Sequence, residues 1–503
     1  MKNTIKIFAG LIAIGLVSCD PEFENPVDEN GFYTSGEANL TNYVAVGNSL
    51  TAGYADGALY ITGQENSYPN IMAQQFALAG GGEFTQPLMN DNIGGLLAGG
   101  QQVFENRLVL SADADGSNPS PVRLEGTPTT SVENSAAGPF NNMGVPGAKV
   151  FHLNANGYGS LNPWFGRFQT SQSASVIEDA ASLNPTFFSL WIGNNDILGY
   201  ATNGGDGVDQ TGNFDPTTYG PNDITDPNVF AAAYSAQVDA LNAGASGGVL
   251  VNIPDVTSIP YFTTVPARSI PLDAATAGAV NAQFAQYNDV LLPTLVTFGV
   301  ITPEEAAARR INFSAGVNYP IMTDDDLTDL SLILQGPPAN LPPALATLLG
   351  QLRQANQNDL VVLTAASVLG AQPDPSNPLG IIGVSIPLED KFVLTEVEQG
   401  RVSAAASAYN ATIQGLASAN GLAFVDARSA LATVAANGVN YSGGVLTSTF
   451  VTGGAFSLDG VHPTARGYAF TANLIIKELN DTYGATIPMV EIGNYPTITL
   501  ANN

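Results

Sequence analysis

The sequence is poor in several residue types, and each shortage excludes a class of function. Its 503 residues include one cysteine, two histidines, and 15 lysines and arginines against 44 aspartates and glutamates. One cysteine leaves no intramolecular disulfide and no paired-thiol chemistry. The net charge of −29 argues against nucleic acid as a partner and against binding to an anionic bilayer through a basic patch.

The chain also lacks the side chains of common metal and nucleotide sites. Because cysteine and histidine are so scarce, only carboxylates remain as ligands, and we expect no metal and no cofactor. The sequence contains no Gly-x-Gly-x-x-Gly and no phosphate-binding Gly-Lys-Ser/Thr. The run Asp324-Asp325-Asp326 leaves a surface calcium site open, but we interpret it as the solvated acidic start of a helix.

The position of the one cysteine indicates export. Lys2 and Lys6 flank the start of an apolar run, Ile7–Val17, which is too short to span a bilayer but typical of a secretory signal. The run ends in Leu-Val-Ser-Cys19, which resembles the bacterial lipobox, where the cysteine is acylated. We expect a lipoprotein signal peptide over residues 1–19, lipidation of Cys19, and an exported outer membrane lipoprotein. An ordinary signal peptide with a chance cysteine is the alternative.

The residues after Cys19 predict a spacer. Residues 20–38 are polar and acidic and contain proline, as in a flexible tether. Acidic residues directly after the cysteine resemble the surface-export signals of some Gram-negative lipoproteins, which favours exposure at the cell surface. The sequence does not decide which leaflet or face of the membrane holds the anchor.

The two histidines differ in their surroundings. His462 follows Asp459 by three positions, so on a tight turn the carboxylate reaches Nδ1 and leaves Nε2 free to act as a base. His152 has no acid nearby in sequence, since the nearest are Glu133 and Asp179, and we interpret it as a loop or core residue. His462 is therefore the candidate base, although Asp-Gly-x-His also occurs in ordinary turns.

Ser49 is the candidate nucleophile. It follows Asn42–Val46, a run rich in strand-forming residues, and Thr51–Tyr54 can open a helix. A serine between a strand and a helix lies where open α/β sheets bind their ligands. The segment is not the Gly-x-Ser-x-Gly elbow, because Thr51 replaces the second glycine. A simple helix N-cap serine is the alternative.

Two further segments offer donors for an oxyanion. Asn195, in Gly-Asn-Asn195-Asp, follows the predicted strand Thr186–Ile192, and its side-chain amide can donate to a developing negative charge. Gly144 and Gly147 flank a proline in a loop where a backbone N–H can approach a substrate. A polar turn or helix cap explains the first segment equally well, and a plain turn explains the second.

In this order the four segments resemble the blocks of the SGNH hydrolases, also called the GDSL esterase/lipase family. The resemblance covers roughly residues 40–260 and 390–482 and implies Ser49 as nucleophile, His462 as base and Asp459 as its orienting acid. It also implies an oxyanion hole made of the backbone N–H groups of Ser49 and Gly147 and the side chain of Asn195, with Gly144 as the less favoured glycine. The family usually has Gly-Asp-Ser-Leu, whereas this chain has Asn48, which keeps the shape and loses the charge.

Alternating strands and helices predict a parallel sheet in a three-layer α/β/α fold, like the flavodoxin-like sheet of that family. We place the hydrolase domain at residues 39–482, with a large insertion at 261–390, followed by a tail at 483–503. The predicted elements are helices at 68–78, 172–183, 228–242, 401–420 and 465–483, strands at 42–46, 186–192, 248–253 and 422–426, and a hairpin near 102–110 in an irregular 80–140 segment.

Two segments are candidates for covering the site. Residues 200–226, rich in Gly, Asn and Asp, form a predicted loop over it. The 261–390 insertion is long enough to be a cap, with Leu341–Leu352 as a candidate lid helix, although a structural excursion beside the sheet explains it equally well.

The favoured function is that of a secreted, lipid-anchored serine esterase or lipase that forms an acyl-serine intermediate. One alternative is a carbohydrate acetylesterase using the same site, although Trp164 and Trp191 are the only tryptophans available to stack on sugars. Another is a surface lipoprotein that binds glycan or lipid without catalysis. The expected partner is thus an ester of a lipid or an acylated glycan, and the sequence fixes neither the acyl-chain length nor the oligomeric state.

Overall fold

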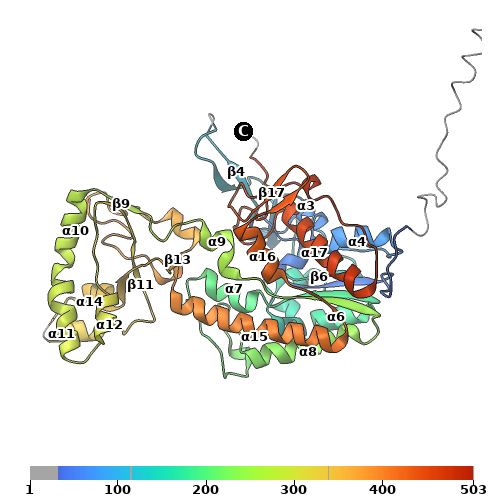
Figure 1. The fold of residues 1–503 in the computed structure, drawn as a ribbon, viewed down its shortest axis with the longest axis horizontal. Coiled ribbons are helices and arrows are strands. Elements are labelled where there is room, and N and C mark those ends of the chain that lie inside the picture. The colour runs from blue at the N-terminus through green and yellow to red at the C-terminus, as the bar shows by residue number, and fades with distance from the viewer. Residues whose placement is uncertain (1–31, 114–115, 338, 502–503) are drawn as a thin grey trace, which may run out of the picture.

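The computed structural model describes residues 32–113, 116–337 and 339–501. The predicted signal peptide, Cys19 and residues 20–31 of the predicted tether lie outside these ranges. The body of the molecule is a five-stranded parallel sheet with helices on both faces (Figure 1). The predicted three-layer α/β/α fold is thereby confirmed.

The sheet brings distant segments of the chain to one edge. Its spatial order is β6-β1-β7-β8-β15, and every pairing is parallel. Numbered by chain order this is 2-1-3-4-5, the flavodoxin-like arrangement. The direction in which successive strands are added to the sheet reverses between β1 and β7. Ligands of such sheets bind at that reversal point, beyond the carboxyl ends of the strands. The strands are β1 (Tyr43–Gly47), β6 (Asn142–Gly144), β7 (Phe187–Trp191), β8 (Gly247–Val251) and β15 (Ala423–Val425).

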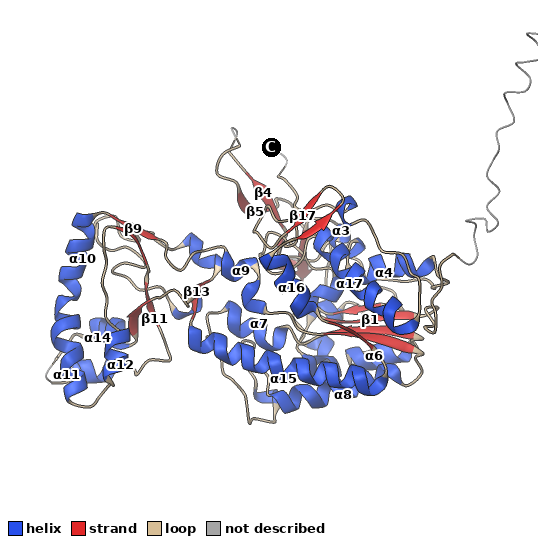
Figure 2. Cartoon of the chain, in the orientation of Figure 1, coloured by secondary structure: helices blue, strands red, loops and turns tan. Residues whose placement is uncertain are grey.

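The strands are short and apolar because both faces of the sheet are covered. All residues of β1, β6, β7 and β8 are buried, as expected for a parallel sheet between two helical layers. One layer holds α4 (Tyr68–Ala77), α16 (Ala427–Ala436) and α17 (Ala465–Tyr483). The other holds α6 (Val176–Ser182), α7 (Asn195–Thr202), α8 (Pro227–Asn242) and α15 (Glu396–Asn420), as Figure 2 shows.

The helix that closes the fold spans the residues predicted for it because both ends carry strong local signals. Thr464 Oγ1 accepts a hydrogen bond from Gly467 N at 3.1 Å, which caps the first turn of α17. Gly484 ends the helix with φ of +63°, a conformation that favours glycine. By contrast, α15 begins five residues before the predicted helix, at a capping box formed by Thr395 and Glu398.

The irregular 80–140 segment contains two hairpins rather than the one predicted near 102–110. The first pairs β2 (Gly94–Ala98) with β3 (Gln101–Asn106), and the second pairs β4 (Leu108–Ser111) with β5 (Ser120–Arg123). The range predicted as one hairpin covers β3 of the first hairpin and β4 of the second, which do not pair with each other. The turn at Gly99 and Gly100, where φ is positive at both residues, sets the true register of the first hairpin.

The insertion forms a lobe beside the body, on the left of Figure 1. It has its own hydrophobic core, which includes Val280, Leu292, Leu334 and Leu352. Its main elements are α10 (Ala274–Gln286), α11 (Leu292–Thr297), α12 (Pro303–Ala308), α14 (Pro343–Gly350) and the two-stranded pairs β9 (Ile270–Leu272) with β10 (Gly316–Asn318) and β11 (Ile321–Thr323) with β12 (Leu352–Gln354).

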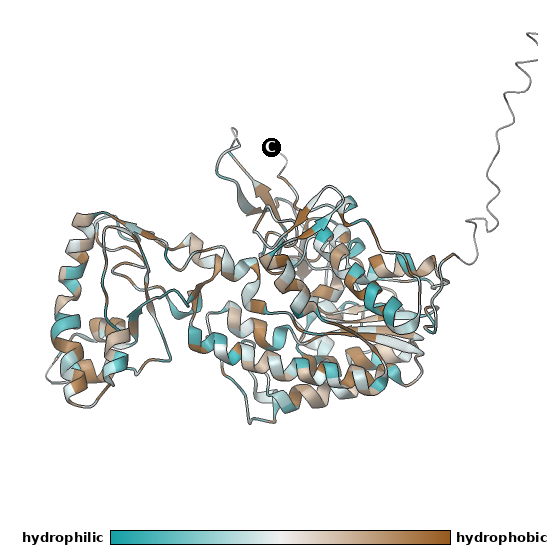
Figure 3. Cartoon of the chain, viewed as in Figure 1, coloured by the Kyte–Doolittle hydropathy of each residue, from teal (hydrophilic) through white to brown (hydrophobic). Residues whose placement is uncertain are grey.

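The C-terminal segment packs against the body instead of leaving it. Ile487 and Ile492 are buried, and Leu110 N donates to Thr499 O at 2.8 Å. Among the residues described, no helix combines the length and the apolar character needed to cross a bilayer, and the long helices α15 and α17 both carry hydrophilic residues (Figure 3).

Candidate active site

Ser49 occupies the first position of a one-turn helix, α2 (Ser49–Ala52), directly beyond β1. The N-cap is Asn48, whose Oδ1 accepts from Leu50 N at 3.0 Å, so Ser49 is not a capping serine. The Ser49 side chain is therefore free for another partner. As the first helical residue, Ser49 also presents a backbone N–H that no carbonyl of the helix can accept.

His462 and Asp459 complete a hydrogen-bonded chain with Ser49. His462 Nε2 lies 2.9 Å from Ser49 Oγ, and His462 Nδ1 lies 2.8 Å from Asp459 Oδ2. Burial disfavours ionisation of Asp459, but the charge of His462 and hydrogen bonds to the carboxylate outweigh it and hold the Asp459 pKa at about 2. A permanent carboxylate at Nδ1 keeps the proton there and leaves Nε2 as the acceptor facing the serine.

The turn that carries Asp459 and His462 is docked onto the segment after α2, a contact that the sequence analysis did not foresee. Asp56 Oδ1 accepts from Leu458 N at 3.0 Å, and Asp56 N donates to Ser457 Oγ at 2.9 Å. Asp56 has φ of +54°, which an Asp before a glycine tolerates. Asp56 and Ser457 thus hold the two halves of the site together from about 400 positions apart in the chain. In the sequence, the Asp56-Gly57 pair indicates a turn but not this contact with the His462 segment.

Asn195 and Gly147 lie on adjacent segments beyond the strands. Asn195 is the first residue of α7, lines the same pocket as Ser49 and His462, and donates from Nδ2 to Ala148 O at 2.9 Å. That bond uses one of the two amide hydrogens of Asn195 and leaves the other for a ligand. Gly147 has φ of +79° and open space where a Cβ would lie, although it does not line the pocket itself.

The other members of these two segments have structural roles. Gly144 packs against α2 so closely that a Cβ would lie 2.3 Å from Ala52 N, which leaves no room for a substrate. Asn194 Oδ1 accepts from the side-chain amide of Asn48 at 3.2 Å, which joins the Asn195 segment to the Ser49 segment. Gly147 is therefore the less crowded of the two glycines.

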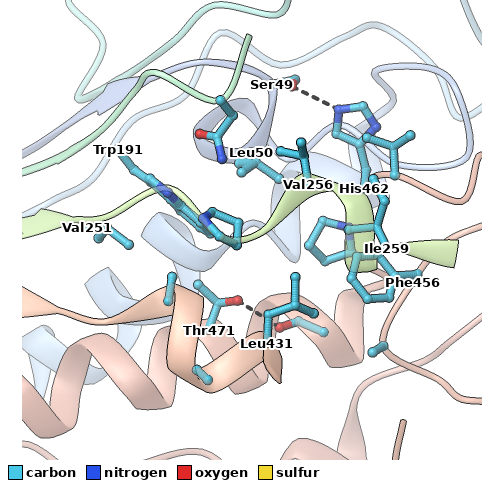
Figure 4. Close-up of a pocket in the computed structure, with 18 of the residues that line it drawn as sticks. Ser49, Leu50, Trp191, Val251, Val256, Ile259, Leu431, Phe456, His462 and Thr471 are labelled. Atoms are coloured by element: carbon cyan, nitrogen blue, oxygen red, sulfur yellow. Dashed lines mark hydrogen bonds between the residues drawn. The ribbon is translucent and has the colours of Figure 1, made fainter. Parts of the chain in front are cut away.

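An apolar pocket runs from Ser49 into the body between the sheet and the α16–α17 layer (Figure 4). Leu431 and Thr471 lie at the end of the pocket opposite Ser49 and His462 in that view. The pocket has a cavity volume of about 120 Å³ and opens to solvent. Its apolar lining is formed by Leu50, Trp191, Leu198, Val251, Pro254, Val256, Ile259, Val425, Ala427, Ala430, Leu431, Val434, Ala455, Phe456, Val461, Pro463, Gly467, Phe470 and Leu474.

No sequence motif predicted this pocket. Its wall combines residues of β8, β15, α16 and α17 that are nearly 200 positions apart and carry no motif. Small and branched apolar residues alternate on α16, but this pattern is common in packed helices and does not indicate a pocket.

Neither predicted cover lines the pocket. No residue of 200–226 lines it, and Lys149 Nζ binds this loop elsewhere through Asp223 O at 2.7 Å. The predicted lid, Leu341–Leu352, belongs to the core of the lobe, and no residue of 261–390 lines the pocket. The structure therefore does not support the predicted lid helix, because Ala346 and Leu349 of α14 are buried in the lobe's own core.

His152 has the structural role expected of it. Its Nδ1 accepts from Lys149 N at 3.1 Å, and its ring stacks on Tyr158 at 4.8 Å between centroids. Burial, and secondarily the charge of Lys149, lowers its pKa to about 4. His152 therefore stays neutral near pH 7, away from the Ser49 chain.

Comparison with known proteins adds little to this geometry. No protein-family model matches the chain, and no curated protein matches it. Among solved structures the chain is similar to a mutant of Axe2, an acetyl-xylooligosaccharide esterase from Geobacillus Stearmophilus, over 88% of this chain and 96% of that one, at 9% identity and a TM-score of 0.30. At that level of similarity, function has to be argued from the site of this chain.

Proposed function

We propose that the protein is a serine esterase that hydrolyses carboxylic esters with apolar acyl chains through an acyl-serine intermediate. The observation that carries the proposal is the continuous hydrogen-bonded chain from Ser49 Oγ through His462 to Asp459. The chain has a nucleophile, a base and an acid that fixes the tautomer of the base, in the relation that acyl transfer requires.

The reaction follows from these contacts. Ser49 Oγ attacks the ester carbonyl carbon while its proton passes to His462 Nε2. Collapse of the tetrahedral intermediate breaks the bond to the alcohol oxygen, and His462 returns the proton to that leaving alcohol. A water molecule then attacks the acyl-serine with His462 again as the base, and collapse releases the acid and restores the Ser49 hydroxyl.

The negative charge of each tetrahedral intermediate needs donors on the opposite side of the carbonyl. The free amide hydrogen of Asn195 and the backbone N–H groups of Ser49 and Gly147 are the donors we assign to it. Asn195 lines the pocket beside Ser49, and its bond to Ala148 O fixes the amide before substrate arrives. Such preorganised donors are effective because they need no rearrangement during the reaction.

The apolar pocket supports an acyl chain rather than a bare acetyl group as the preferred acid part. Each methylene that enters it contributes about 0.8 kcal/mol, which corresponds to roughly a fourfold gain in kcat/KM. The carbohydrate acetylesterase alternative finds less support, because Trp164 and Trp191 are only 5% and 4% exposed.

We also propose that the enzyme is anchored at the outer membrane through acylated Cys19. The proposal rests on the lipobox-like segment alone, which lies outside the described residues. Globomycin should block its processing, and Cys19→Ala should move the protein from the membrane fraction to the soluble fraction. Unchanged membrane association of the variant would contradict it.

The enzyme itself is tested with a panel of p-nitrophenyl esters from acetate to palmitate and with a fluorophosphonate probe. We expect the probe to label the wild type but not Ser49→Ala. It should also label the control Ser173→Ala, which removes an exposed serine outside the pocket. We expect kcat/KM to rise with chain length beyond acetate. A maximum at acetate, with release of acetate from xylan, would favour the acetylesterase, and failure of both probe and esters would favour a binding protein.

A further inference from the structure

A group of carboxylates lies where the lobe meets the body, away from the Ser49 pocket. Asp325 follows β11 of the lobe, Asp390 belongs to the segment that returns to the body, and Glu398 lies in the first turn of α15. One carboxylate oxygen of each lies within 4.8 Å of the corresponding oxygens of the other two. The prediction that Asp324–Asp326 starts a helix is wrong. The run is a turn after β11, and α13 begins only at Ser331.

The neighbouring acids are paired, but these three face one another. Asp324 forms a buried ion pair with Arg353, and Asp326 pairs with Arg401. Among the described residues, no arginine forms an ion pair with the Asp325 carboxylate. The backbone N–H of Asp325 donates to Asp390 Oδ1 at 3.3 Å. Asp206 adds a fourth negative charge that acts on both Asp325 and Asp390. The cluster therefore carries more negative charge than its arginines balance.

Glu398 is the buried member of this group of carboxylates. Its side chain is fully buried, and Oε2 accepts from Thr395 N at 2.6 Å, but Oε1 has no hydrogen-bond partner. Gly205, with φ of +89°, packs directly against this carboxylate, since a Cβ on it would lie 2.1 Å from Oε1. A buried carboxylate oxygen without a partner is costly unless a cation or a proton satisfies it.

We propose that Asp325, Asp390 and Glu398 bind a calcium ion that fastens the lobe to the body. All the side-chain ligands are carboxylates, which suits a hard cation and not zinc or copper. Two oxygens bound to one Ca²⁺ at about 2.4 Å can lie up to about 4.8 Å apart, whereas the shorter Mg²⁺ distance of about 2.1 Å demands a tighter, octahedral set. Exposure of Asp325 gives the ion a path from solvent.

The electrostatics agree with this geometry. Burial, and then the charge of Asp325, raises the pKa of Asp390 to about 7, and burial with the charges of Asp390 and Asp325 raises that of Glu398 to about 8. Burial and mutual repulsion disfavour three negative charges in this cluster, and a divalent cation would offset both. Because the three ligands come from the lobe, the returning segment and α15, the bound ion restrains the lobe relative to the sheet.

The experiment uses the whole chain freed of metal with EDTA and then titrated with CaCl₂, followed by calorimetry of binding and of thermal unfolding. We expect saturable binding and a rise in Tm of roughly 2–3 °C at a calcium concentration 100 times Kd. Glu398→Gln keeps the shape and the bond from Thr395 N, and Asp325→Asn changes an exposed residue that folding does not need. Both variants should bind at least tenfold more weakly and lose most of the Tm rise.

Glu178→Gln is the matched control, because Glu178 closes an equivalent capping box with Ser175 at the start of α6. It should keep the full calcium response. No calcium-dependent Tm rise in the wild type, an equal rise with NaCl of the same ionic strength, or full responses in Asp325→Asn and Glu398→Gln would overturn the proposal. An equal response to MgCl₂ would overturn the choice of calcium.

Discussion

Asp459 holds His462 at two points. Asp459 Oδ2 lies 2.8 Å from the ring nitrogen Nδ1, and Oδ1 accepts from the backbone N–H of His462, also at 2.8 Å. Oδ1 further accepts from Val461 N at 2.9 Å, and Oδ2 from Gly57 N at 2.9 Å. The Asp459 carboxylate thus shapes the turn, orients the imidazole ring and sets its tautomer. A substitution that keeps the shape of Asp459 but removes its charge separates these roles.

Asp459→Asn should reduce kcat by about 10⁴ while leaving the fold intact, as expected when a catalytic histidine is held in the wrong tautomer. The amide oxygen must stay at Oδ1 to accept the two backbone N–H groups, so the NH₂ group faces Nδ1. Nδ1 then becomes an acceptor, Nε2 carries the proton, and Ser49 loses its base. Hydrolysis of a p-nitrophenyl ester measures kcat, circular dichroism checks the fold, and a loss below tenfold would contradict the assigned role.

Asn195→Ala should lower kcat by about 10² to 10³ with little change in KM, because the oxyanion forms only during the reaction. Steady-state kinetics on one ester separates the two parameters. Asn203→Ala, at the other end of α7, is the control, since Asn203 Nδ2 binds Gly199 O and faces no pocket residue. Activity of Asn195→Ala within fivefold of the wild type would remove Asn195 from the oxyanion hole.

Leu431→Trp should shorten the accepted acyl chain. Leu431 lines the pocket at the end opposite Ser49, so an indole fills the space that a long chain needs (Figure 4). We expect kcat/KM for acetate and butyrate esters to stay within about threefold and that for octanoate and longer esters to fall at least tenfold, since several buried methylenes are lost. Leu416→Trp, the same change on α15 outside the pocket, should leave the profile unchanged, and an unchanged profile in Leu431→Trp would contradict the assignment.

Asp196→Asn should change how stability depends on pH. Burial raises the pKa of Asp196 to about 6, against hydrogen bonding and the charge of Lys149, which lower it. Between pH 4 and 6 the folded state therefore binds more protons than the unfolded chain, and the stability that Asp196 contributes falls as pH rises. The free energy of unfolding of the wild type, relative to the variant, should fall by about 2 kcal/mol from pH 4 to pH 7. Urea unfolding across that range measures it, and a constant difference would contradict the shift.

The sequence alone determined the local parts of this molecule. Strand-forming runs ended by glycine, the Thr464 cap and Gly484 fixed the elements that flank the site, because such signals act over a few neighbouring residues. The order of Ser49, Gly147, Asn195 and His462 along the chain indicated which chemistry to look for. Carboxylate and imidazole three positions apart could be paired because a single turn joins them.

Only the tertiary structure decided what surrounds these parts. The 2-1-3-4-5 strand order places Ser49 and Asn195 on either side of the reversal point, and Asp56 docks the His462 turn across about 400 positions. The apolar wall of the pocket, the inward-facing α14 and the Glu398 cluster also join distant segments. Burial and pairing of this kind depend on which faces meet in space, and a residue's neighbours in the chain do not specify that.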